Sequence, residues 1–306
     1  MPCRGVRASM SDMRLGILGM SPGNGHPYSW SAICNGYDKK FMDECPFPVI
    51  PDYLYKQNYP EDFIEGAKVT HIWTQDRRIS EHVALASRIE NVVDKPTDML
   101  GEVDGILLAR DDAEHHLTMS RDFIEAGLMI YIDKPLAFDL KTAREIFSLE
   151  KFDGQIFSCS ALRYARELEE ALEKLNELGT ITYVEAHTIK KWSTYSAHII
   201  DPVLRIVGYD HKIADVKKFG NQNDQGCLLQ MEDGLIVQLS AHKSTRITTG
   251  SIRVFGDKCD LGISFADTFY SFRAALKAFI KSVEQRKSVI PKAHVLTMVD
   301  WLERGM

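Results

Sequence analysis

Runs rich in apolar, β-branched and aromatic residues alternate with stretches of helical spacing through the first half of the chain. The runs span residues 13–19, 69–74, 103–109 and 128–132, and apolar positions recur at helical spacing over 79–89 and 116–126. Strands that are apolar throughout and separated by helices are typical of a parallel sheet covered on both faces. The first half therefore predicts a doubly wound α/β domain with a parallel sheet.

The pattern changes after about residue 155, where strand-like segments are joined partly by short polar turns. These segments span residues 155–162, 180–188, 226–231, 235–242 and 251–255, and helical stretches at 166–178 and 272–284 flank them. Short turns favour antiparallel neighbours. We therefore expect a frayed tail over 1–12, a first domain over 13–154, and an α+β domain over 155–306 with a large, mostly antiparallel open sheet.

One segment, residues 36–66, shows little periodicity. It contains Pro46, Pro48, Pro51 and Pro60 together with several aromatic residues. Long loops of this kind include functional lids as well as packed surface excursions. The sequence leaves both interpretations open.

Composition excludes several classes of protein. A formal net charge of -6 without a dense basic tract argues against a nucleic-acid partner. No stretch approaches the ~18 consecutive apolar residues of a membrane span, and residues 1–12 lack the apolar core of a secretory signal. The six cysteines form no C-x-x-C pair, so reduced thiols in a cytoplasmic protein are expected.

A glycine-rich turn follows the first apolar run. It contains Gly19, Ser21, Gly23, Asn24 and Gly25. Between a strand and a helix, such a turn lets backbone N–H groups approach a pyrophosphate, which predicts a Rossmann dinucleotide-binding domain. The spacing departs from G-x-G-x-x-G, and a simple tight turn is the alternative.

The cofactor's ribose is expected near the end of the second strand. Asp76 there would accept the 2′-hydroxyl of NAD, whereas Arg77 or Arg78 would accommodate the 2′-phosphate of NADP. The sequence does not decide between the two cofactors.

The stretch from His116 through Gly127 to Lys134 and Pro135 resembles the signature of the glucose-fructose oxidoreductase/inositol dehydrogenase (Gfo/Idh/MocA) family. Asp133 stands where that family has a glutamate. The resemblance implies that Lys134 lies beside the nicotinamide and the reacting carbon. It also leads us to expect Arg110, His116 and Pro135 at the cofactor.

The resemblance extends into the second half of the chain. Arg163 matches the arginine of the family's Arg-Phe pair, and His198 with Asp201 matches the second half of an Asp-x-x-x-His-x-x-Asp arrangement. Thr194 stands where the first aspartate of this arrangement often lies. Asp201 is expected to be a structural or orienting group rather than a replacement for that aspartate. Without the family resemblance, His198 would be interpreted as a histidine packed in the core.

Substrate contacts are expected from Lys134, Arg163, Lys191, Thr194, His198 and Asp201. Oxidation of an alcohol requires that the hydroxyl lose its proton while hydride leaves carbon. His198 suits the proton transfer, and the Lys134 ammonium suits stabilisation of the oxygen. Lys191 could equally belong to a solvated basic edge.

Four residues, Asp111, Asp112, His115 and His116, have the side chains of metal ligands. Adjacent histidines point in different directions, so we expect no metal.

The leading hypothesis is an NAD- or NADP-dependent oxidoreductase acting on a sugar, cyclitol, nucleotide sugar or similar small molecule. An NAD-dependent glycoside hydrolase on the same fold and a catalytically silent dinucleotide-binding protein are the alternatives. The resemblance also implies a homo-oligomer, either a dimer or a tetramer.

Overall fold

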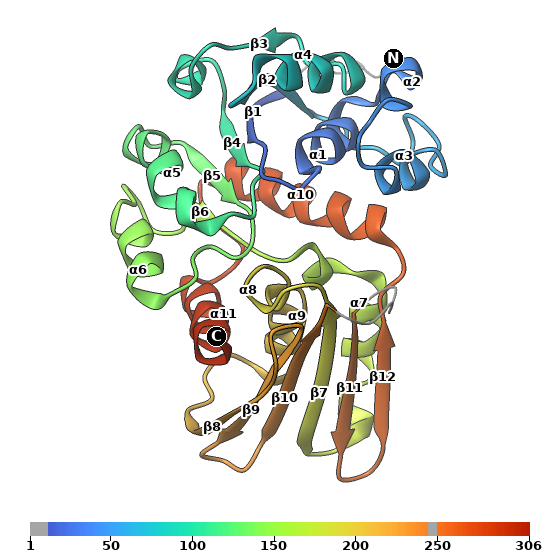
Figure 1. Cartoon of the computed structure of the whole chain (residues 1–306), viewed down its shortest axis with the longest axis vertical. Coiled ribbons are helices and arrows are strands. Elements are labelled where there is room, and N and C mark those ends of the chain that lie inside the picture. Colours follow the sequence, from blue (N-terminus) through green and yellow to red (C-terminus); the bar gives the residue numbers. More distant parts are fainter. Residues whose placement is uncertain (1–11, 244–249) are drawn as a thin grey trace, which may run out of the picture.

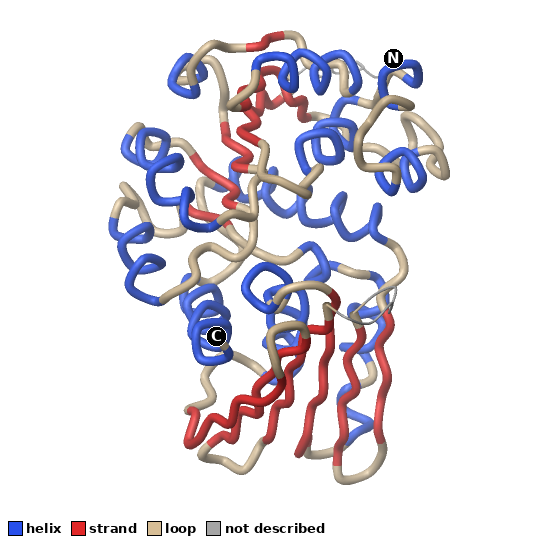
Figure 2. The backbone as a smooth tube through the Cα atoms, viewed as in Figure 1, coloured by secondary structure: helices blue, strands red, loops and turns tan. Residues whose placement is uncertain are grey.

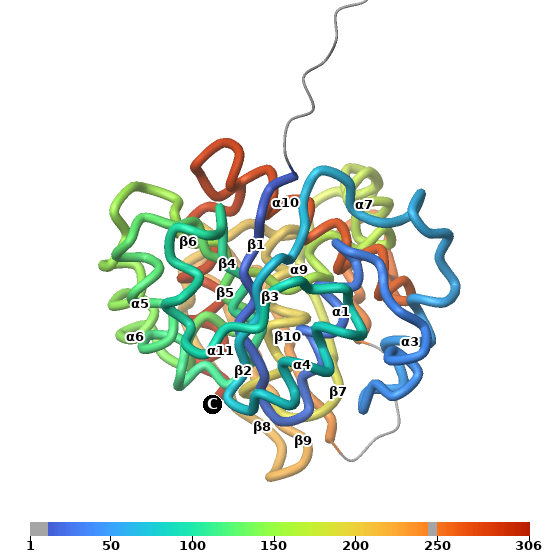
Figure 3. Tube along the Cα trace, turned by 90° about the horizontal axis from the view of Figure 1, so that it is seen from above, coloured from blue at the N-terminus to red at the C-terminus, as the bar shows by residue number. Residues whose placement is uncertain are grey.

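The computed structural model describes residues 12–243 and 250–306. The expected tail, apart from Asp12, lies outside the described residues. Two six-stranded sheets are arranged one above the other along the long axis of the molecule (Figure 1). Seen from above, the strands of the first sheet project over those of the second (Figure 3).

The first sheet is parallel, as the alternation of strands and helices predicts. Its strand order is β3-β2-β1-β4-β5-β6, and every neighbouring pair is parallel. The strands are β1 (Met13–Gly19), β2 (Ala67–Thr74), β3 (Asn91–Val92), β4 (Gly105–Leu108), β5 (Met129–Ile132) and β6 (Ile156–Phe157). All residues of β4 and β5 are buried, which explains their continuous apolar sequences.

Helices and 3-10 turns connect these strands. They are α1 (His26–Asn35), α2 (Lys39–Met42), α3 (Val49–Leu54), α4 (Arg77–Ala86), η1 (Pro96–Met99), η2 (Ala113–His115), α5 (His116–Glu125) and α6 (Leu140–Ser148). Both helices predicted in this half are confirmed as α4 and α5. Side-chain caps explain where α4 and α6 begin. Asp76 accepts from the Arg78 N–H at 2.9 Å, and Asp139 accepts from the Thr142 N–H at 2.8 Å.

The second sheet is mostly antiparallel and has the order β12-β11-β7-β10-β9-β8. Only the pair β7 and β10 is parallel. The strands are β7 (Ile181–Ile189), β8 (Ile213–Gly220), β9 (Asp224–Met231), β10 (Ile236–His242), β11 (Ser251–Gly256) and β12 (Asp260–Ser264). The predicted class is confirmed, although β8 and β12 were not expected.

One face of the second sheet is covered by helical segments (Figure 2). They are η3 (Ala161–Tyr164), α7 (Arg166–Glu173), η4 (Leu175–Leu178), α8 (Trp192–Tyr195) and α9 (Ala197–Val207). Along β7, Val184, Ala186 and Thr188 are buried, whereas the alternate residues are partly exposed. This alternation is that of a sheet with one covered face.

Two expectations for the second half were wrong. The segment 155–162 was expected to join the antiparallel sheet, but β6 pairs with β5 as the edge of the parallel sheet, and Ser160 then caps η3. The helix expected at 272–284 is α10 (Thr268–Gln285), and it lies against the first sheet. Apolar periodicity shows which face of a helix is buried but not which element covers it.

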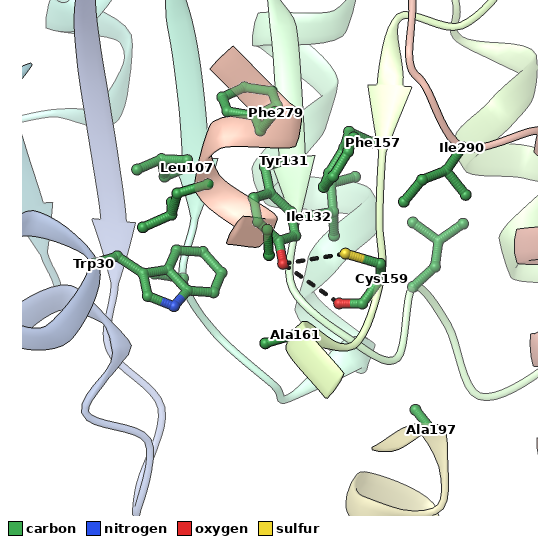
Figure 4. Close-up of a cluster of buried hydrophobic side chains, with 14 of the residues drawn as sticks. Trp30, Leu107, Tyr131, Ile132, Phe157, Cys159, Ala161, Ala197, Phe279 and Ile290 are labelled. Atoms are coloured by element: carbon green, nitrogen blue, oxygen red, sulfur yellow. Dashed lines mark hydrogen bonds between the residues drawn. The ribbon is translucent and has the colours of Figure 1, made fainter. Parts of the chain in front are cut away.

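Aromatic rings join α10 to the first sheet (Figure 4). The Phe279 ring lies 5.7 Å from those of both Tyr131 and Phe157, and Trp30 of α1 stacks on Tyr131 at 4.7 Å. The last helix, α11 (Lys292–Gly305), packs between α6 and α9. The C-terminal helices therefore connect the two sheets. No helix among the described residues is long and apolar enough to cross a membrane.

Candidate active site

The glycine turn lies at the carboxyl end of the parallel sheet, between β1 and α1. Gly23 has a φ of +82°, and a Cβ atom there would meet no other atom within 4 Å, so the backbone faces open space. A Cβ on Gly25 would lie 2.6 Å from Ile50 and 2.7 Å from Phe47. Only glycine fits these two positions without strain or displacement. An open glycine turn before a ten-residue helix fits the pyrophosphate of a dinucleotide.

Side chains fix this turn against neighbouring strand ends. The Ser21 hydroxyl donates to Asp111 at 2.6 Å, and the Asn24 amide donates to Asp133 at 3.1 Å. The Met20 N–H donates to the Gln75 side chain at 2.9 Å. The turn is therefore held by residues that follow β2, β4 and β5.

Lys134 lies two residues beyond β5 and is only 3% exposed. Its Nζ lies 3.7 Å from the Asp111 carboxylate and donates to the Thr194 carbonyl at 3.4 Å. The Tyr195 ring lies 5.3 Å from the same nitrogen. The peptide bond to Pro135 is cis. Buried charges occur where partners compensate for lost water, and Lys134 has such partners.

Asp133 is also buried, with 1% exposure. Its carboxylate accepts from His26 Nδ1 at 2.7 Å, from Asn24, and from the backbone N–H of Lys134 at 2.8 Å. Burial alone would raise the pKa of Asp133, but His26 and Lys134 lower it to about 2. Asp133 is therefore anionic and links the glycine turn to the lysine.

His198 belongs to the first turn of α9. Its Nδ1 lies 2.9 Å from the Ser160 hydroxyl, and its ring lies 5.2 Å from that of Tyr195. Burial and then the nearby Lys134 charge lower the pKa of His198 well below its usual value. The imidazole is therefore neutral at physiological pH.

One cavity of about 330 Å³ joins these elements. It is lined by Gly23, Asn24, Gly25, His26, Asp111, Lys134, Tyr195 and His198, among others. Segment 36–66 is packed rather than extended, and its residues Phe47, Val49, Ile50 and Tyr53 line an apolar wall of the same cavity. The structure thus brings the turn, the lysine and the histidine together.

Residues 53–160 match the family described as "Oxidoreductase family, NAD-binding Rossmann fold". Over these residues the chain is similar to the Gfo/Idh/MocA family. The matched residues include Lys134, whereas the glycine turn precedes them. No curated protein matches the sequence.

Solved structures share the fold over nearly the whole chain. The scyllo-inositol dehydrogenase from Lactobacillus casei is 14% identical, with a TM-score of 0.73 over 95% of this chain and 94% of that one. GenD2 from gentamicin A biosynthesis, solved with NAD, is 14% identical, with a TM-score of 0.74 over 100% and 96%. The myo-inositol dehydrogenase from Lactobacillus casei, solved with NAD(H) and myo-inositol, is 15% identical, with a TM-score of 0.72 over 94% and 91%. At these identities the likeness shows the fold alone.

Two residues expected at the cofactor's ribose lie outside the cavity. Asp76 is exposed and caps α4, while Arg77 donates to Glu81 at 2.9 Å and pairs with Asp94. Both lie where β2 ends, beside the Gln75 contact to the glycine turn. Their position is at the carboxyl edge of the sheet, the edge at which open α/β sheets bind ligands.

Two further residues expected at the cofactor support the backbone nearby. Arg110 is buried. Its guanidinium donates to the Asp112 carboxylate at 2.8 Å and to the Gln75 side-chain oxygen at 3.2 Å. The two ring nitrogens of His116 lie 3.0 and 2.9 Å from the carbonyl oxygens of Leu136 and Arg110. Neither residue is among the described residues that line the cavity.

Asp201 and Arg163 form a buried ionic cluster behind the site. Asp201 accepts from Arg163 at 2.9 Å, from His294 at 2.7 Å and from the Ser160 N–H at 2.7 Å. Burial would raise the pKa of Asp201, but the Arg163 charge and the His294 contact lower it. Because Ser160 also contacts His198, the cluster positions the histidine. The structure does not bring Asp201 or Arg163 to the described lining of the cavity.

The remaining expected substrate residues differ in position. Lys191 is exposed, and Lys190 rather than Lys191 lines the cavity. Thr194 contributes its carbonyl oxygen to Lys134. Within 12–243 and 250–306, no three His, Cys, Asp or Glu side chains are grouped as metal ligands.

Sequence reasoning missed His26, Tyr195 and the apolar wall. His26 follows Gly25 directly at the start of a helix, and Tyr195 precedes His198 by three residues, so that both could face one site. These spacings were the available signals. The partner of His26, by contrast, lies 107 residues away.

Proposed function

We propose that this chain is an NAD-dependent dehydrogenase that acts on a hydroxyl-bearing carbon of a sugar, cyclitol or similar small molecule. One observation carries the proposal. A single cavity joins the glycine turn to the buried ammonium of Lys134 and the neutral imidazole of His198. This combination suits proton removal and charge stabilisation beside a bound nicotinamide.

The dinucleotide would lie across the carboxyl edge of the first sheet. Gly19, Gly23 and Gly25 would let its pyrophosphate approach the N-terminus of α1. Asp76 would accept a ribose hydroxyl. Because Arg77 is already paired with Glu81 and Asp94, we infer that NAD is preferred over NADP.

Lys134 and His198 would contact the reacting oxygen from two sides of the cavity. Bound NAD would supply the acceptor for the hydride that leaves the substrate carbon. His198 is uncharged and therefore able to accept the hydroxyl proton as that bond breaks. Lys134 stabilises the negative charge that develops on the oxygen. Asp111 and the Thr194 carbonyl hold the ammonium in place.

We further infer a division of labour along the chain. Residues 13–154 would bind the dinucleotide, and 155–306 would shape the substrate site and mediate homo-oligomer formation. The division is not strict, because α10 packs on the first sheet and segment 36–66 lines the substrate cavity.

Cofactor titration followed by a substrate screen tests the proposal. Binding of NADH and of NADPH would be measured by energy transfer from protein tryptophan to the nicotinamide. Turnover would be measured by absorbance at the nicotinamide band. The panel includes myo-inositol, scyllo-inositol, aldoses and nucleotide sugars with either oxidised cofactor. We expect tighter binding of NADH and reduction of NAD by at least one polyol. Glycoside cleavage without net NADH formation would instead indicate the hydrolase.

A further inference from the structure

His26 is a second imidazole on the wall of the cavity. Its side chain is 16% exposed, and Nδ1 lies 2.7 Å from Asp133. The ring stacks on Trp30 at 4.8 Å and meets the edge of Phe272 at 5.1 Å. One carboxylate and two aromatic rings therefore fix its orientation.

The contact with Asp133 determines which nitrogen carries the proton. Asp133 is anionic and can only accept, so Nδ1 of His26 must donate to it. In the neutral ring, Nε2 then carries the free lone pair. Among the described residues, no hydrogen-bond partner is found for this nitrogen. A carboxylate-backed imidazole with a free Nε2 is the arrangement of a general base.

The imidazoles of His26 and His198 differ in the group that contacts Nδ1. Nδ1 of His198 contacts a neutral hydroxyl, that of Ser160, and its ring lies in the field of the Lys134 ammonium. A positive charge on His198 is therefore disfavoured. Nδ1 of His26, by contrast, lies 2.7 Å from a carboxylate, that of Asp133.

We propose that His26, oriented by Asp133, is a second general base that exchanges a proton with the substrate in this cavity. The inference rests on the proposed dehydrogenase function. In the oxidative direction one hydroxyl proton moves in each turnover: when the O–H bond breaks, that proton passes to Nε2 of His26 rather than to His198. The C–H bond supplies a hydride to NAD, and the C=O bond forms. In reduction the same proton returns from the imidazolium to the alkoxide oxygen.

The groups that act on His26 come from several elements. Asp133 and Lys134 follow β5, His198 lies on α9, and α10 presents the apolar ring of Phe272. Asp111, after β4, pairs with Lys134 and offsets part of its charge. The pH dependence of turnover should therefore respond to changes at Asp133 and Lys134.

The test is the pH profile of turnover of the cofactor-loaded enzyme, with the polyol that the unmodified chain oxidises. His26→Asn removes the base but keeps an N–H that can donate to Asp133. Asp133→Glu keeps the carboxylate and serves as the conservative variant. His211→Asn is the matched control, because His211 contacts Asp233 at the same 2.7 Å away from the cavity.

We expect His26→Asn to lower kcat at neutral pH by about tenfold or more and to remove one ionisation from the acid limb of the profile. NADH affinity should change by less than about threefold. Asp133→Glu should retain that ionisation at a shifted position, and His211→Asn should match the unmodified chain. If His26→Asn keeps the original profile, or alters only NADH binding, the inference is overturned while the dehydrogenase function stands. Absence of turnover by the unmodified chain overturns both.

A second measurement does not depend on the folding of a variant. Nitrogen-15 NMR of histidine-labelled protein with NADH bound reports which ring nitrogen carries hydrogen. We expect the Nδ1–H form for His26. The Nε2–H form would remove the free lone pair from the cavity and overturn the inference.

Discussion

The ammonium of Lys134 lies 3.7 Å from the carboxylate of Asp111, at the ends of two neighbouring parallel strands. Asp111 in turn accepts from the Ser21 hydroxyl of the glycine turn at 2.6 Å. The proposed catalytic charge and the proposed cofactor turn therefore share one partner.

The first prediction concerns Gly25. Gly25→Ala would bring a Cβ within 2.7 Å of Phe47 and Ile50, so the turn or the apolar wall must move. We expect NADH affinity to fall about tenfold, as measured by tryptophan-to-nicotinamide energy transfer. Gly262→Ala is the control, because a Cβ there meets nothing within 4 Å. Equal affinities for the two variants would argue against a cofactor role for the turn.

The second prediction concerns the charge state of His198. Because burial and the Lys134 charge both lower its pKa, the ring should be neutral at its ordinary pKa of 6.5 and above in NMR titration. Lys134→Met should raise the pKa of His198, because it removes the charge that is the largest cause after burial. An unchanged titration in that variant would mean that the two groups do not interact.

Asp133 gives a third prediction, on stability against pH. Its folded pKa of about 2 lies below the ordinary value of 3.8, so ionised Asp133 stabilises the folded chain above about pH 4. This contribution, about 2 kcal/mol, is lost as the pH falls toward 2. In urea unfolding, the difference between the unmodified chain and Asp133→Asn should therefore narrow between pH 5 and about pH 2. Asp153 is exposed, so the difference in unfolding free energy between Asp153→Asn and the unmodified chain should not narrow over this pH range.

The sequence predicted the parallel sheet well, for a physical reason. Strands buried on both faces are apolar: β4 and β5 are buried at every position and carry no polar side chain other than Tyr131, whereas β1 and β2 follow this pattern over part of their length. The two-residue strand β6 is too short to indicate its partner. Likewise, the apolar stripe of α10 does not reveal that it packs against Tyr131.

The site was predictable only where a local motif marks it. Lys134 and His198 carry the family resemblance in their neighbours, and the structure places both on one cavity. His26 begins α1 and meets Asp133 only because β1 and β5, which are separated by β4, end at the same edge of the parallel sheet. Contacts of this kind depend on tertiary structure and leave no spacing in the sequence.

The fourth prediction concerns Asp201. Asp201→Asn would remove a fully buried charge that pairs with Arg163 and His294. We expect a loss of about 3 kcal/mol in the free energy of unfolding, measured in guanidinium chloride. Turnover should also fall, since Ser160 would no longer be held beside His198. The surface variant Asp233→Asn, which loses a comparable contact to His211, should cost little. A small loss for Asp201→Asn would show that the cluster is not structural.

Single-turnover formation of NADH by Lys134→Met tests the central claim most directly. With NAD and the preferred polyol, we predict a rate lower by about 10² or more than that of the unmodified chain, because the stabilisation of the oxygen is lost. NADH affinity should be nearly unchanged, and Lys141→Met, which alters an exposed lysine, should behave as the unmodified chain. A normal rate in Lys134→Met would contradict the account.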